Sequence, residues 1–122
     1  MKKMMMSVSV CVGILIAVGM SQAAGNVETG KKLFESPTLG GGTSGRSCLT
    51  CHPGGTNLSR RLFGNSQDSA AAIAKKRSKL TAMVNTCIER PLAGKAIDPA
   101  GDEMADLVAY MESLVKDKNS AR

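Results

Sequence analysis

The chain has 122 residues and a formal net charge of +6, with 16 lysine and arginine residues against 10 acidic ones. This length allows one domain. Only 2% of the residues are aromatic, so the interleaved rings and cations of nucleic-acid-binding surfaces are missing, and we exclude nucleic acid as a partner. A domain of this size has little apolar surface to bury, a deficit that a large apolar cofactor would offset.

The first 23 residues have the pattern of an export signal. Lys2 and Lys3 give a basic start, Val8–Met20 is an uncharged apolar run, and residues 21–23 (Ser-Gln-Ala) offer small residues at a cleavage site. The apolar run is about 13 residues long, shorter than the ~20 that a membrane-spanning helix needs. We therefore predict a signal peptide over residues 1–23 and a periplasmic domain over residues 24–122, with no stable membrane anchor.

The first predicted helix is a short amphipathic segment over residues 28–35, which Pro37 stops. Residues 37–47 follow as a loop that its glycines are expected to make flexible. Residues 56–66 show no regular period. This part of the chain therefore predicts one helix and long connections around the segment from Cys48 to His52.

A long second helix is predicted from a cap at Asp68 or Ser69 to about Glu89, because Pro91 then ends it. Its apolar positions keep a helical period: Ile73, Leu80, Val84, Cys87 and Ile88. The last helix is predicted to start with Asp98 as N-cap and Pro99 in the first turn. One apolar stripe follows, made of Met104, Leu107, Val108, Met111, Leu114 and Val115. No segment alternates as a strand does, so the fold class is all-α, with three main helices.

The segment Cys48-Leu49-Thr50-Cys51-His52 is the C-x-x-C-H signature of covalent haem attachment. Two thiols, spaced by two residues on a helical turn, can add across the two vinyl groups of one haem. The adjacent histidine is then placed to reach the iron as the proximal ligand. His52 is the only histidine of the chain, so the sequence predicts one haem c held by Cys48, Cys51 and His52.

Three other interpretations compete for the same residues. A thioredoxin-type dithiol would need a βαβ context, which the pattern lacks. A zinc site would combine Cys48, Cys51, His52 and Cys87, but the adjacent Cys51 and His52 cannot easily both point at one tetrahedral ion. A disulfide between Cys48 and Cys51 would be strained and would leave His52 without a role. The remaining Cys11 precedes the predicted cleavage site and is expected to be removed with the signal.

On these residues the chain resembles class I cytochromes c over residues 26–116. In that family an N-terminal helix crosses the C-terminal helix closely, with a glycine and aromatic rings at the crossing. Gly30 and Phe34 match this pattern on the first helix, and Leu107 and Tyr110 match it on the last. The resemblance implies the cytochrome c fold, with three main helices and glycine-rich loops around one haem.

The second axial iron ligand is less defined, because no Pro-Met loop precedes the last helix. Residues 84–90, followed by Leu92, Gly94 and Lys95, resemble the haem domains of thiosulfate dehydrogenases and sulfur-oxidising cytochrome complexes, in which a cysteine ligates iron. This resemblance implies Cys87, with Met83 and Met104 as alternatives. Arg90 would then lower the pKa of the Cys87 thiol by stabilising its thiolate.

These observations predict a periplasmic carrier of single electrons between redox proteins. The basic residues Arg60-Arg61 and those between 75 and 79 form either a solvated helix face or a docking patch for an acidic partner. The alternative function is a haem enzyme, or an enzyme subunit, acting on thiosulfate or related sulfur anions held by Arg77, Arg90 and Lys95.

Overall fold

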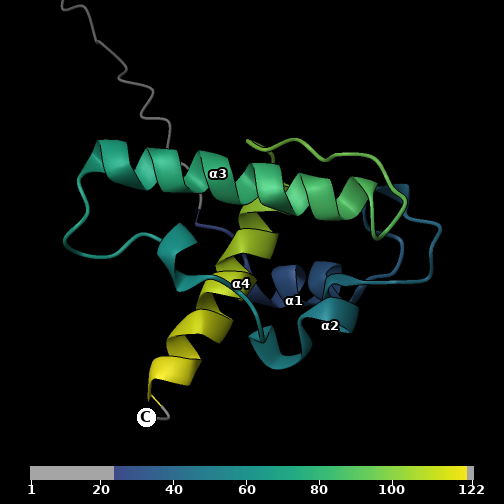
Figure 1. The fold of residues 1–122 in the computed structure, drawn as a ribbon, viewed down its shortest axis with the longest axis horizontal. Coiled ribbons are helices and arrows are strands. Elements are labelled where there is room, and N and C mark those ends of the chain that lie inside the picture. Colours follow the sequence, from purple (N-terminus) through teal and green to yellow (C-terminus); the bar gives the residue numbers. More distant parts are fainter. Residues whose placement is uncertain (1–23, 121–122) are drawn as a thin grey trace, which may run out of the picture.

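The computed structural model describes residues 24–120, so the predicted signal segment lies outside the described residues. Within that range the chain is all helical, without strands. The α-helices are α1 (Val27–Glu35), α2 (Cys48–Cys51), α3 (Ala70–Glu89) and α4 (Asp102–Ser120), and the short 3₁₀ turns are η1 (Leu39–Gly41), η2 (Pro53–Gly55) and η3 (Arg60–Leu62) (Figure 1). No helix of this described part is both long and apolar enough to cross a membrane.

Helix α1 begins where Asn26 can cap it. The Asn26 side chain accepts a hydrogen bond from the Thr29 amide at 3.0 Å, which satisfies one of the free amides of the first turn. The Asn26 amide in turn donates to the Asp106 side chain on α4 at 2.6 Å. The residues at the start of α1 therefore set both its register and its position against α4.

Helices α1 and α4 cross in close contact at Gly30. A Cβ atom built at Gly30 would lie 1.9 Å from the Asp106 carbonyl oxygen, so only glycine allows this approach. Next to the crossing, the rings of Phe34 and Tyr110 meet edge to face, with centroids 5.3 Å apart. The crossing predicted from Gly30, Phe34, Leu107 and Tyr110 is thus present.

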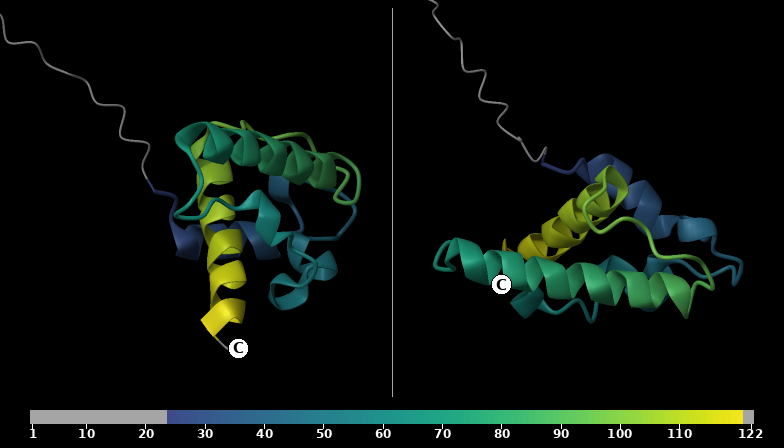
Figure 2. Two further views of the ribbon diagram at one scale, coloured as in Figure 1. Left: turned by 60° about the vertical axis from the view of Figure 1, so that its left-hand side comes forward. Right: turned by 90° about the horizontal axis from the view of Figure 1, so that it is seen from above.

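Helix α3 lies across the crossed α1–α4 pair (Figure 2). Ser69 caps it by accepting from the Ala72 amide at 3.2 Å, and it ends at Glu89, as the sequence predicted. Leu80, Val84 and Ile88 are buried. The other two positions of the predicted helical period are not buried: Ile73 is 44% exposed and Cys87 is exposed. The N-terminal half of α3 extends beyond α4 (Figure 1).

The start of α4 was predicted three residues too early, with Pro99 instead of Asp102 as the first helical residue. Asp98 does not cap the helix: its carboxylate accepts from the Ala100 amide at 2.9 Å, which closes a separate turn. The first helical hydrogen bond at this end runs from the Ala105 amide to the Gly101 carbonyl. The local turn that Asp98 makes with its own neighbours thus competes with capping, and the helix begins at Asp102.

The glycine-rich loop before α2 is packed. The Lys95 amide donates to the Gly40 carbonyl at 2.8 Å, and the Thr43 amide donates to the Leu92 carbonyl at 3.0 Å. Gly40 has a φ of +63°, and a Cβ there would lie 2.3 Å from the Lys95 carbonyl oxygen. Glycine is therefore needed at this position for a left-handed turn and a close backbone approach rather than for flexibility.

The apolar core lies between α1, α3 and α4. Its fully buried large side chains are Phe34, Ile88, Leu92, Met104 and Leu107. Asn85 fixes the segment after α3, because its side chain donates to the Ile97 carbonyl at 2.9 Å and accepts from the Ile97 amide at 3.0 Å.

Replacing Gly30 by alanine should destabilise the protein by about 2 kcal/mol or more, despite the ~1 kcal/mol gained in helix propensity. The added methyl group forces the backbones of α1 and α4 apart. Chemical unfolding measures the change. The control is Gly64→Ala, where a Cβ would meet only side-chain atoms of Ile73, the nearest at 3.2 Å, and no backbone atom; equal losses in both variants would contradict the crossing.

Asn85→Leu should lower the free energy of unfolding by about 1–3 kcal/mol, because it leaves both polar groups of Ile97 without their partner. Thr86→Ala is the control, since the Thr86 hydroxyl only donates to the Ala82 carbonyl within its own helix. Thermal melts of both variants compare the losses. A loss in Thr86→Ala as large as that in Asn85→Leu would mean that the bonds to Ile97 do not stabilise the fold.

Candidate functional site

The turn that contains Cys48 and Cys51 is fixed from its first residue. Ser47 is buried, and its amide donates to the Thr50 hydroxyl at 3.0 Å. The Thr50 amide donates back to the Ser47 carbonyl, and the His52 amide donates to the Cys48 carbonyl at 2.9 Å. Cys48 and Cys51 therefore lie at the two ends of a single helical turn, with His52 directly after it.

His52 is held in one tautomer. Its Nδ1 lies 2.8 Å from the Thr56 carbonyl oxygen. A carbonyl can only accept, so Nδ1 carries the proton and donates, which leaves a lone pair on Nε2. Histidines that bind metals are oriented by this kind of hydrogen bond on the other ring nitrogen. The bond prepares His52 to ligate through Nε2.

The turn after His52 brings the Thr56 carbonyl into place. Pro53 opens η2, and Gly54 and Gly55 both have positive φ values, of 58° and 75°. A Cβ at Gly55 would lie 2.8 Å from the Leu114 Cβ on α4. The turn is therefore packed on the C-terminal helix, and this contact supports the position of the His52 ring.

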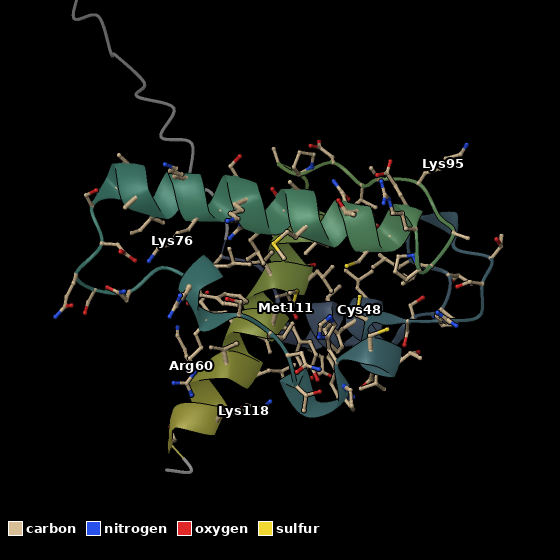
Figure 3. All side chains as sticks on the ribbon, in the orientation of Figure 1. Cys48, Arg60, Lys76, Lys95, Met111 and Lys118 are labelled. Atoms are coloured by element: carbon tan, nitrogen blue, oxygen red, sulfur yellow. The ribbon has the colours of Figure 1, made fainter. Side chains whose placement is uncertain are left out.

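A cavity lies between this turn and helix α3. The space measures about 600 Å³ including its open mouth. His52 and Cys48 line it from the turn at α2, and Met83 and Cys87 line it from α3. The remaining wall is largely apolar and consists of Phe34, Asn57, Leu58, Ser59, Leu62, Phe63, Leu80, Val84 and Met111. Figure 3 shows Cys48 and Met111 on the side of the molecule below the C-terminal half of α3.

Cys48 is partly buried in this wall, whereas Cys51 is exposed. Burial, and after it the negative charge of a Cys87 thiolate, raises the pKa of the Cys48 thiol to about 11. In a thioredoxin-type dithiol the first cysteine has a lowered pKa, so the opposite shift of Cys48 argues against that interpretation. In the described residues no group of three or more histidine, cysteine or acidic side chains could hold a metal ion.

The proposed second ligands differ in placement. Met83 is 49% exposed although it lines the cavity, and Cys87 lies one helical turn further along α3. Met104 is completely buried in the core and is not part of the cavity wall. Met111, which the sequence placed in the apolar stripe of the last helix, is buried in the core and lines the cavity as well.

Although Cys87 is exposed as a residue, partial burial of its thiol raises the pKa, and the charge of a Cys51 thiolate raises it as well. The prediction that Arg90 lowers this pKa was therefore wrong, since Arg90 lies exposed beyond the end of α3. Lys95 and Arg77 do not line the cavity either, and its wall contains no charged residue. The three cations that the sequence placed around a sulfur anion are thus not brought together there.

The sequence did not identify one wall of the cavity. Residues 57–63 were treated as irregular, yet Leu58, Leu62 and Phe63 face the cavity and pack with the core. Leu58 and Leu62 are four residues apart and Phe63 follows directly. This apolar spacing is the sequence signal for a packed segment. It is too short to predict which elements it packs against.

Comparisons of the chain with family models, with curated proteins and with solved structures found no match.

Proposed function

We propose that this chain is a periplasmic monohaem c-type cytochrome that carries single electrons between redox proteins. The observation that carries the proposal is the arrangement of Cys48, Cys51 and His52. The two thiols lie at the two ends of one helical turn. The adjacent imidazole is fixed by a hydrogen bond at Nδ1, which leaves Nε2 available to a metal. When bound, haem supplies one iron that accepts and releases one electron.

The residues present fit this group by their chemistry. Cys48 and Cys51 are free thiols, as thioether formation requires. The cavity wall is largely apolar, as the faces of a porphyrin require, and includes the sulfur-containing side chains of Met83 and Cys87 as well as His52. The close crossing at Gly30 and the edge-to-face pair of Phe34 and Tyr110 support the finer assignment to the cytochrome c fold.

We further propose Cys87 as the second iron ligand. It lines the same cavity as His52, whereas Met104 does not. The raised pKa of the Cys87 thiol is compatible with this role, because metal coordination itself deprotonates a thiol. Met83 is the alternative that the same wall offers.

The lack of charged residues in the cavity wall favours electron transfer over the alternative reaction on sulfur anions. Beside the haem, thiosulfate and related anions would meet a largely apolar wall that has no cationic side chain to neutralise them, and unpaired burial of charge is costly. An electron carrier needs no such site, since its iron only changes oxidation state.

The carrier function predicts a reversible one-electron titration of protein exported by a host with haem-attachment machinery. Spectroelectrochemistry should fit a single one-electron step. Cys48→Ser combined with Cys51→Ser should abolish the covalent haem, while Cys87→Ala should keep it. Rapid haem reduction by thiosulfate alone would contradict the carrier and favour the enzyme.

The ligand assignment predicts that Cys87→Ala changes the ferric spectrum and raises the reduction potential, because loss of a thiolate stabilises the ferrous state. Met83→Leu should leave both unchanged and serves as the matched control. Electron paramagnetic resonance and redox titration measure the two properties. A ferric methionine charge-transfer band that survives Cys87→Ala but is lost in Met83→Leu would assign Met83 instead.

A further inference from the structure

A second hollow lies on the other side of the cavity wall. It runs between the loop after η3, the N-terminal half of α3 and the C-terminal half of α4, and its space is about 810 Å³ including the open mouth. We call it the α3–α4 groove. Its lining includes Leu62, Phe63, Ile73, Arg77, Glu112 and Lys116.

The groove combines an apolar floor with excess positive charge. Ile73 lines the groove and is 44% exposed, and the buried side chains of Phe63 and Val108 form the floor of the groove. Glu112 is its one acidic residue and is already paired with Lys116 at 2.9 Å. Arg77 forms no ion pair with any residue that the structure describes.

The hollow continues at both ends rather than closing around a small molecule. Towards the end of α4 it merges with a depression that Arg60 lines, sharing Phe63 and Lys116 with it. Arg60 is likewise without an ion pair among the described residues. In the other direction Arg77 and Glu112 also line a third hollow, which contains Asp102 and is more acidic than the groove. An extended depression of this kind is suited to contact with the surface of another protein.

The position of the groove links it to the proposed haem site. Leu62, Phe63 and Leu80 line both the groove and the cavity that contains His52. A partner seated in the groove would thus be separated from the cavity by one layer of side chains. Figure 3 shows Arg60 and Lys76 on the side of the molecule away from Cys48, so this surface differs from the edge at Cys48 and Cys51.

We propose that the α3–α4 groove docks an acidic redox protein, which places an apolar side chain against Ile73 and Phe63 and carboxylates against Arg60 and Arg77. The apolar contact gives the affinity and the unpaired arginines give the orientation. This docking proposal rests on the proposed function in one respect. An electron would have to travel between the partner and the haem through the layer of side chains at Phe63 that the groove and the cavity share.

The test uses haem-loaded, isotope-labelled protein and a synthetic peptide with one leucine flanked by glutamates. In nuclear magnetic resonance titrations the peptide should shift the amides of Gly64, Asn65 and Ile73, and rising salt should weaken its binding. Arg60→Glu and Arg77→Glu should each weaken binding by about five- to tenfold, since each replaces an attraction by a repulsion. Lys32→Glu, the same charge change on α1, should have no effect.

Three results would overturn the docking proposal. The peptide could cause no shifts, or it could shift residues 48–52 and depend on Arg46 rather than on Arg77. Alternatively, Arg77→Glu could change the sedimentation of the protein alone, which would make the groove a contact between copies. The Soret band of the same sample tests the proposed function separately. A sample without a Soret band contains no haem, so the proposed function would fail whether or not the peptide binds.

Discussion

The backbone contact between Gly30 and Asp106 is the constraint on which the other elements of this small protein depend. It brings α1 and α4 so close that no side chain fits between them. Leu114, further along α4, then packs against Gly55 and supports the turn after His52. A steric requirement at one glycine is thus connected, through a single helix, to the position of the imidazole.

The two sides of the cavity are built by different means. The turn of Cys48 and Cys51 is fixed by local hydrogen bonds of Ser47 and Thr50, which depend little on the rest of the fold. The side that contains Met83 and Cys87 is placed only by the packing of α3. The proposed proximal ligand therefore depends on local structure, and the proposed distal ligand depends on tertiary packing.

Much of the helical structure could be predicted from the sequence because its signals are local. Ser69 and Pro91 bound α3, and Gly30 with Phe34 marks the crossing face of α1. The start of α4 was misplaced because Asp98 makes a turn with Ala100 instead of capping a helix. The left-handed conformation and close approach of Gly40 depend on Lys95, a contact across 55 residues that no local pattern encodes.

The candidate site also has one part that is visible in the local sequence and another that depends on tertiary packing. The residues Cys48, Cys51 and His52 are contiguous, so their pattern was visible without a structure. The burial of Cys48, the exclusion of Met104 from the cavity and the position of Arg90 depend on tertiary packing. The expected electrostatic partner of Cys87 was wrong because proximity in sequence at the end of a helix does not determine where a long side chain lies.

The most direct test of the central claim is the intact mass of the exported protein under denaturing conditions, where only covalent attachment retains haem. The account predicts the mass of residues 24–122 plus one haem, with the added mass on the proteolytic peptide that contains Cys48 and Cys51. The bare polypeptide mass, from a host shown to mature another c-type cytochrome, would contradict it.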